Sequence, residues 1–298
     1  MKRTRTLRGV GLVAGLMALL LPLAACGGDG DDDEATGEGG TVTLGIIPSW
    51  TDGLSLAYLW KNVLEEKGYT VKIDEIPDAA PLYTGVAKGD VDIYPSAWPE
   101  VTHKSYMEKY GDDLEDLGAY YDNAKLTMAV PDYMDIDSIE DLKGMASDLD
   151  GKIIGIEAGA GLTKAVKDNV IPDYGLGDDF TLVESSTTAM LAELGKAVKN
   201  KDDVVVTLWR PFWANSEFPV KDLEDPKGAL GEPETLNAIA TDGFSDDFPE
   251  VAEMMGNLKL DDDQYGSLEK LVVDNEGDEE QAVATWVKEN PDVIKSLG

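Results

Sequence analysis

The hydrophobic positions after residue 40 follow two alternating periodicities. Short apolar runs, typical of buried strands, alternate with segments whose apolar side chains recur every three or four positions, as in amphipathic helices. The predicted strands are Thr41–Ile47, Thr70–Ile76, Val91–Tyr94, Lys152–Ile156, Thr181–Glu184 and Val204–Leu208. The predicted helices are Gly53–Lys67, Ala80–Lys88, Leu162–Asn169, Met190–Val198 and most of the chain from Pro249 onward. Repeated strand–helix–strand units predict an α/β fold with mainly parallel sheets flanked by helices.

The strand–helix series occurs twice, over Thr41–Tyr94 and over Lys152–Leu208. Two apolar segments, Lys125–Val130 and Leu236–Ala240, flank the second series on either side. They are candidate strands that cross between two lobes.

The two crossings divide the chain into two predicted lobes. Residues 41–124 with residues 237–298 form lobe 1, and residues 125–236 form lobe 2. Ligands of open α/β sheets bind beyond the carboxyl ends of the strands, so the strand ends of both lobes would face one ligand cleft. A single continuous sheet remains the alternative.

The first 25 residues predict an export signal that is not part of the fold. A basic start is followed by the apolar stretch Val10–Leu23 and by the lipobox Leu23-Ala24-Ala25-Cys26. The stretch is short for a bilayer span, and small residues before a cysteine permit cleavage in front of it. We expect residues 1–25 to be a lipoprotein signal peptide and Cys26 to be lipidated, which anchors the chain at the extracytoplasmic face of the cell membrane. An uncleaved membrane anchor with a chance cysteine is the alternative.

An acidic, glycine-rich segment, residues 26–40, follows the signal and is predicted to be a flexible tether. The whole chain has 59 acidic and 25 basic residues, which gives a formal net charge of −34 at pH 7. This charge argues against nucleic acid as a partner and against electrostatic attachment to anionic lipids. Membrane contact is therefore expected through the lipid anchor alone.

Four of the six tryptophans follow predicted strands. They are Trp50, Trp98, Trp209 and Trp213. Indoles gathered beyond strand ends would form an aromatic cage, and such cages recognise quaternary ammonium groups through cation–π attraction. Trp60 and Trp286 instead fall in apolar series with helical spacing, which is typical of core positions.

The chain offers little for catalysis or metal binding. Cys26 and His103 are its only cysteine and histidine, which excludes disulfides, Cys/His metal clusters and a buried catalytic thiol. No Gly-x-Ser-x-Gly elbow is present, and the acidic run Asp261–Asp263 lacks the spacing of a calcium loop. Gly159-Ala160-Gly161 resembles a phosphate loop only loosely and is interpreted as a tight strand-to-helix turn. We expect no catalytic residue, metal or cofactor.

Five segments carry a family resemblance that covers the chain from Thr41 to Gly298. They read SWTDGLSLAYLWKNVLEEKGYTV, GDVDIYPSAWPEVTHKSYMEKYGDDLEDLG, GKIIGIEAGAGLTKA, VVVTLWRPFWA and VKDLEDPKGALGEPETLNAIATDGFSDDFPE. In these segments the chain resembles the substrate-binding proteins of glycine betaine/proline betaine ABC importers. The resemblance implies a hinged, two-lobe type II fold like that of periplasmic binding proteins. It also implies an indole cage in the cleft and delivery of the ligand to an ABC permease and its ATPase.

The resemblance implies roles for single residues of the cage. Trp98 matches a cage tryptophan of the first lobe, and Trp209 or its neighbour Trp213 matches one of the second lobe. Phe212 stands where many relatives have histidine, and a C-terminal tryptophan of some relatives is replaced here. Trp50 is a candidate for the missing wall.

For the anionic end of a ligand, Gly53 and Leu54 lie where the family uses backbone N–H groups. They open a predicted helix, whose free N–H groups and dipole suit an anion. Arg210 is a candidate partner for a ligand carboxylate, with pairing to one of the many acidic side chains as the alternative. His103 and Phe212 are expected to support the site from behind, and direct ligand contact by His103 is the alternative.

Together with these patterns, the resemblance implies a receptor that captures glycine betaine or a related quaternary-ammonium osmolyte outside the cell, and we expect it to be a monomer. A choline or carnitine receptor of the same fold is the alternative. A more distant alternative is a cell-surface hydrolase with two carboxylates in the cleft, because the carboxylates are too numerous to exclude such a pair.

Overall fold

The structure, a computed structural model, describes residues 39–298. The predicted signal peptide, Cys26 and all but the last two residues of the predicted tether lie outside this range. Among the described residues, no helix is both long and apolar enough to cross a membrane.

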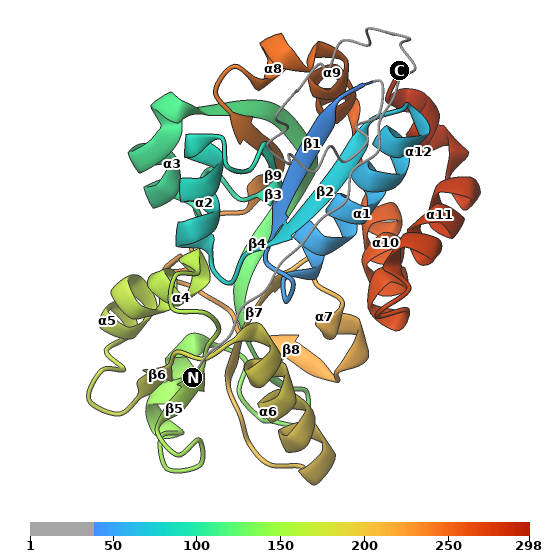
Figure 1. Ribbon diagram of the computed structural model, residues 1–298. Coiled ribbons are helices and arrows are strands. Elements are labelled where there is room, and N and C mark those ends of the chain that lie inside the picture. Colours follow the sequence, from blue (N-terminus) through green and yellow to red (C-terminus); the bar gives the residue numbers. More distant parts are fainter. Residues whose placement is uncertain (1–38) are drawn as a thin grey trace, which may run out of the picture. The chain divides into compact units, whose positions relative to one another are not determined.

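The strands of the described range belong to one mixed sheet (Figure 1). They are β1 (Thr41–Ile46), β2 (Thr70–Glu75), β3 (Ile93–Ala97), β4 (Leu114–Pro131), β5 (Lys152–Ile154), β6 (Thr181–Val183), β7 (Val206–Arg210), β8 (Val220–Asp222) and β9 (Glu234–Thr241). Their order across the sheet is β2-β1-β3-β9-β4-β7-β5-β6, and β8 pairs with β4 beside this path.

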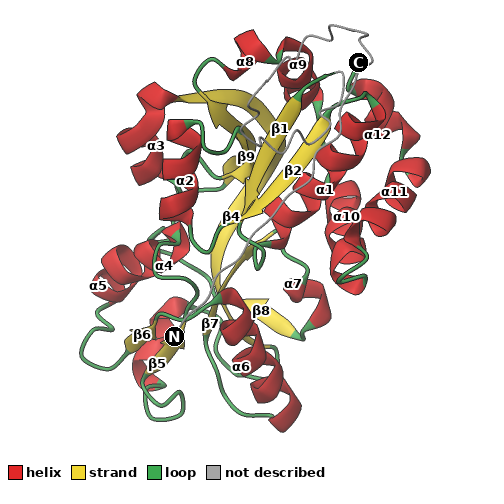
Figure 2. Cartoon of the chain, in the orientation of Figure 1, coloured by secondary structure: helices red, strands yellow, loops and turns green. Residues whose placement is uncertain are grey.

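Helices flank the strands, as Figure 2 shows in red and yellow. They are α1 (Thr51–Glu66), α2 (Ala79–Lys88), α3 (Lys104–Tyr110), α4 (Gly161–Ala165), α5 (Ile171–Tyr174), α6 (Thr187–Asn200), α7 (Ala214–Glu217), α8 (Phe244–Asp247), α9 (Pro249–Asn257), α10 (Asp262–Asp274), α11 (Glu279–Glu289) and α12 (Pro291–Ser296). A π-helical turn, Val166–Val170, joins α4 to α5, so the predicted helix Leu162–Asn169 is longer than expected.

Two sets of parallel strands are joined by antiparallel crossing strands. β1 pairs in parallel with β2 and β3, and β5 pairs in parallel with β6 and β7. The crossing strands β4 and β9 contain the predicted segments Lys125–Val130 and Leu236–Ala240. β4 pairs with β9 as far as Ala124 and with β7 from Lys125 onward. "Mainly parallel" therefore describes each set of strands, but the sheet as a whole is mixed because one strand is shared by both sets.

The helices bury the apolar side chains that their spacing predicts. α1 begins at Thr51, two residues earlier than expected, and ends before Gly68, whose φ of +90° suits glycine. Trp60 of α1 is 1% exposed. Trp286 of α11 is 2% exposed and donates from Nε1 to Ser267 Oγ of α10 at 2.9 Å. Both tryptophans are core residues, as predicted.

Candidate functional site

Three of the predicted cage tryptophans meet in one cavity. Trp50 follows β1, Trp98 follows β3, and Trp209 lies near the end of β7. The cavity is lined by Trp50, Asp52, Trp98, Thr102, His103, Leu126, Ile156, Ala160, Gly161, Leu162 and Trp209. Its cavity volume in this structure is about 30 Å³. Both sets of strands thus bring indoles to a single site, and contact of these indoles with a ligand stays a prediction.

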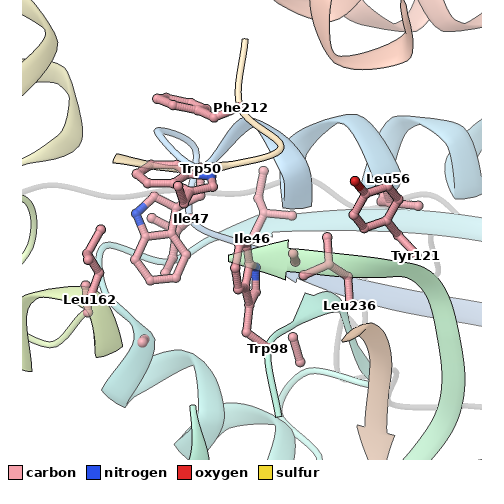
Figure 3. Packing of buried hydrophobic residues seen from close by; sticks show 14 of the residues in the cluster. Ile46, Ile47, Trp50, Leu56, Trp98, Tyr121, Leu162, Phe212 and Leu236 are labelled. Atoms are coloured by element: carbon pink, nitrogen blue, oxygen red, sulfur yellow. The ribbon is translucent and has the colours of Figure 1, made fainter. Parts of the chain in front are cut away.

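Hydrogen bonds hold the polar edges of two of these indoles. Nε1 of Trp50 donates to Glu157 Oε2 at 3.1 Å, and Nε1 of Trp98 donates to Asp52 Oδ2 at 3.2 Å. Figure 3 shows Trp50 and Trp98 among the buried apolar side chains. Protein carboxylates bind the N–H groups of both indoles, so only the apolar ring surfaces of Trp50 and Trp98 are available to line the cavity.

The loop after β3 is held by an acceptor on β9. The Glu234 carboxylate accepts hydrogen bonds from three consecutive backbone N–H groups, those of residues 100–102, at 2.8 to 3.0 Å. The same loop brings His103 into the cavity wall. The His103 ring lies parallel to the Trp50 ring, with 5.9 Å between their centroids. Glu234 therefore helps to shape the wall that carries both Trp98 and His103.

His103 presents a neutral imidazole. Burial lowers its pKa to about 3, so the ring is uncharged at neutral pH. The backbone nitrogen of Trp98 and the Tyr83 hydroxyl oxygen lie 3.1 and 3.0 Å from Nδ1 of His103. Because the Trp98 N–H donates to Nδ1, the hydrogen-bond pattern assigns the ring proton to Nε2. His103 lines the cavity, and both its supporting role and its direct contact with a ligand stay predictions.

Asp52 is a carboxylate in the cavity wall that sequence reasoning missed. It is 2% exposed and accepts hydrogen bonds from Ser96 Oγ at 2.7 Å and from Trp98 Nε1. Burial raises the pKa of Asp52, while hydrogen bonds from Ser96, Trp98 and the Gly53 N–H lower it. Its only signal in the sequence is its place in the first turn of α1, where the helix dipole favours a negative charge.

Two further buried carboxyl groups bind residues next to the cavity but do not line it. Glu157 follows β5 and is 8% exposed, and Glu269 of α10 is 1% exposed. The Glu269 carboxylate accepts a hydrogen bond from Thr51 Oγ1. Burial and the charge of Asp52 raise the pKa of Glu269, and hydrogen bonds from Thr51 and the Trp213 backbone lower it, with a net value of about 8. Within residues 39–298, no group of acidic, histidine or cysteine side chains is placed to hold a metal ion.

The end of β7 sends neighbouring side chains to different places. Trp209 reaches the cavity, and Phe212 stacks on it with 4.0 Å between ring centroids. Arg210 binds the Asp222 carboxylate of β8 through Nε at 2.6 Å and Nη2 at 3.0 Å. Trp213 borders a separate hollow together with Arg210. The structure therefore brings neither Arg210 nor Trp213 to the cavity, and their ligand contacts stay predictions.

Gly53 and Leu54 do not line the cavity either. The Gly53 N–H donates to the Asp52 carboxylate, and the Leu54 N–H donates to the Trp50 carbonyl oxygen at 3.1 Å. The second bond begins the helical pattern of α1. In this structure both N–H groups are occupied by protein acceptors, so their contact with a ligand carboxylate also stays a prediction.

The segment Gly159-Ala160-Gly161 turns the chain into α4, as predicted, and also contacts the residues that precede α2 and α3. The Gly159 N–H donates to Asp78 Oδ2 at 3.2 Å. A Cβ at Gly161 would overlap the Thr102 carbonyl group, so this close approach requires glycine. Gly161 and Leu162 border the cavity, and the N–H groups of a first helical turn have no acceptor within the helix.

The chain matches a protein family and, among curated proteins, a transport binding protein. Residues 40–289 match the family described as the substrate binding domain of ABC-type glycine betaine transport system. The glycine betaine/carnitine transport binding protein GbuC of Listeria monocytogenes is 37% identical over 153 residues, which cover 51% of this chain and 50% of that protein. The match thus spans half the length of this curated relative.

Among solved structures, two examples are similar to most of the chain. The glycine betaine, L-proline binding protein ProX of Borrelia burgdorferi is 30% identical with a TM-score of 0.81, over 86% of this chain and 96% of that chain. Lactococcal OpuAC, in its closed-liganded conformation complexed with glycine betaine, is 31% identical with a TM-score of 0.80. That match covers 86% of this chain and 98% of the lactococcal chain.

Proposed function

The chain belongs to the family of substrate-binding domains of ABC-type glycine betaine transport systems, and from this premise we propose that it captures glycine betaine for an ABC permease. Its fold is the two-lobe type II fold of periplasmic binding proteins that the family resemblance implies. The family consists of solute-binding transport proteins, so the chemistry expected of the site is binding and release.

The convergence of Trp50, Trp98 and Trp209 on one cavity carries this proposal. A trimethylammonium head has no N–H to donate, so it is recognised through its charge and its methyl groups. Each desolvated cation–π contact contributes about 1–2 kcal/mol, against roughly 8 kcal/mol for micromolar binding. The carboxylates of Asp52 and Glu157, which hold two of the indoles, place negative charge near the cation.

We propose that the lobes divide as the sequence predicts. Lobe 1 comprises residues 41–124 and 237–298, and lobe 2 comprises residues 125–236. The change of pairing partner within β4, from β9 at Ala124 to β7 at Lys125, supports the first boundary. Bending at the crossing strands would open the cavity to admit the ligand, and closure would present a shape that the permease prefers.

For the ligand carboxylate, we propose donors that border the same cavity as the indoles. These are the Nε2–H group of His103 and the backbone N–H groups of Gly161 and Leu162 at the start of α4. Hydrogen bonds to a charged group contribute roughly 1.5–3 kcal/mol each. The donors predicted from the sequence would first have to leave the protein acceptors that they bind in this structure.

A choline receptor is the second candidate, and Asp52 is the observation that favours it. This carboxylate lines the cavity and binds the indole N–H of Trp98. Choline carries the same trimethylammonium head without a carboxylate, so a buried negative charge attracts it more strongly than it attracts a zwitterion.

We further propose that the chain works as a monomer at the extracytoplasmic face of the membrane, held there by a lipid on Cys26. The acidic tether would then act as a leash that lets the folded part reach the permease of the ABC complex. A lipid chain together with an acylated amino terminus is sufficient for stable anchoring.

Calorimetry on the mature chain with glycine betaine, proline betaine, choline, carnitine and ectoine tests the proposed ligand. Glycine betaine is expected to bind one to one and roughly tenfold more tightly than choline, a difference of about 1.4 kcal/mol. Tighter binding of choline would promote the second candidate. Turnover of any of these compounds, or binding of none of them, would contradict the receptor function.

A further inference from the structure

Glu157 binds groups of both proposed lobes. Its Oε1 accepts hydrogen bonds from Ser49 Oγ at 3.1 Å and from the Thr187 N–H at 2.9 Å. Its Oε2 accepts from Trp50 Nε1 at 3.1 Å and from Thr187 Oγ1 at 2.9 Å. Each oxygen therefore binds one group of lobe 1, between β1 and α1, and one group of lobe 2, at the start of α6.

We propose that Glu157 is a positioning residue for Trp50, which completes the cage only when the two lobes meet. The proposal rests on the proposed function, because it assigns the Trp50 ring to the ligand. Glu157 acts through the indole N–H, on the edge of the ring, and leaves the ring itself for the cavity.

The Glu157 carboxylate is held in place by lobe 2 alone, whereas the orientation of the Trp50 indole depends on its bond to Glu157. Thr187 supplies two of the four bonds to Glu157, and the N-terminal end of α6 favours a negative charge. The side chain of Trp50 has two rotatable torsions, and an acceptor at a set position selects one orientation of the ring. Separation of the lobes would break the bonds from Ser49 and Trp50 while those from Thr187 persist. Lobe closure therefore orders the cage wall.

The segment that follows Glu157 docks on lobe 1 as well. The Gly159 N–H donates to Asp78, and the Gly159 carbonyl oxygen accepts a hydrogen bond from the Tyr106 hydroxyl at 2.7 Å. At Gly161 the absent Cβ admits the Thr102 carbonyl group. Residues 157–161 thus meet lobe 1 along their length, so the bond to Trp50 forms as part of a wider contact.

A double-mutant cycle on the mature chain tests the proposal. Glu157→Gln keeps the side-chain shape but retains one acceptor oxygen, and Trp50→Phe keeps an aromatic face but removes the N–H donor. Asp225→Asn is the matched control. Asp225 is also a lobe 2 carboxylate that accepts two hydrogen bonds, but its donors, the Tyr174 hydroxyl and the Leu230 N–H, both belong to lobe 2.

Three measurements with glycine betaine as the probe report on each variant. Calorimetry gives Kd, stopped-flow fluorescence gives the association and dissociation rates, and spin labels at the exposed positions Lys88 and Lys199 give the distance between lobes. Glu157→Gln is expected to raise Kd roughly tenfold, mainly through faster dissociation, and to broaden the distance distribution of the liganded protein. The double variant is expected to lose little beyond the larger single effect. Asp225→Asn is expected to change none of these quantities.

An unchanged dissociation rate in folded Glu157→Gln would overturn the proposal. Additive losses of binding free energy from Glu157→Gln and Trp50→Phe in the double variant would overturn it as well. Failure of the unsubstituted protein to bind glycine betaine would instead contradict the proposed function. If Glu157→Gln does not fold, Ser49→Ala takes its place, because it removes one donor from lobe 1 and keeps the carboxylate. An unchanged dissociation rate in Ser49→Ala would then overturn the proposal.

Discussion

Glu269→Gln is expected to change how the stability of the protein depends on pH. Burial against Thr51 and near the charge of Asp52 raises the pKa of Glu269 from 4.5 to about 8. Between these two values the native state holds a proton that the unfolded chain has released. The stabilisation is therefore fully present below about pH 4.5 and is lost as the pH rises through about 8.

The expected size follows from linkage. One bound proton changes the free energy of unfolding by about 1.4 kcal/mol per pH unit, so the contribution of Glu269 falls by on the order of 3 kcal/mol between about pH 5 and pH 8. The Glu269→Gln variant carries no titrating group at this position. The free energy of unfolding of the wild type minus that of the variant should therefore decline between about pH 5 and pH 8.

His103 acts in the opposite direction, so the comparison with the variant is essential. Burial lowers the pKa of His103 from 6.5 to about 3, and the native state therefore gains stability as the pH rises between these values. The histidine is present in both proteins and cancels in the difference. The range between about pH 6.5 and pH 8 lies above its titration and is the cleanest window for Glu269.

Urea unfolding of ligand-free protein at constant ionic strength, followed by tryptophan fluorescence, measures both curves. Thr51→Val provides a second check, because loss of its hydrogen bond removes an influence that lowers the Glu269 pKa. In Thr51→Val, the stabilisation from Glu269 should then be lost at a higher pH than in the wild type. Parallel curves for wild type and Glu269→Gln would refute the buried, protonated state of this carboxyl group.

Trp286→Ala removes a buried core indole and is expected to lower the free energy of unfolding by about 3–5 kcal/mol in denaturant titrations, and unchanged stability would contradict its core role. Trp98→Ala is expected to abolish calorimetrically detectable binding of glycine betaine by a folded protein, so normal binding would argue against the cage. Gly161→Ala places a Cβ against the Thr102 carbonyl group and is expected to raise Kd roughly tenfold or more, with an unchanged Kd as the contrary result. Cys26→Ser is expected to release the protein from the membrane fraction, and retained lipid labelling would refute the anchor.

Burial explains why most of the fold and part of the site could be predicted. A strand such as Thr41–Ile47 and the helical spacing around Trp60 record which side chains face the core, and that pattern is local in the sequence. The meeting of Trp50, Trp98 and Trp209 follows from a single topological fact. Indoles at or just beyond the carboxyl ends of strands reach the same edge once the strands of each set run in parallel.

The neighbours of Trp209 show where that argument ends. Successive side chains of a strand point to opposite faces, so with Trp209 in the cavity Arg210 lies on the other face, where it binds Asp222. Strand alternation could have predicted this. Glu157 and Glu269 could not be found in the same way, because their importance comes from partners distant in the chain and 59 acidic residues conceal them.

The position of β9 has a consequence for the order in which the molecule can be completed. β9 lies between β3 and β4 in the sheet, although it follows both of them in the chain. While the protein is being synthesised, β3 and β4 therefore emerge without the partner that will separate and join them. The pairings of β9 with β3 and β4 cannot be completed until Thr241 has been synthesised. β9 is the last of the described strands along the chain, so the pairings at the centre of the sheet are the last that synthesis allows.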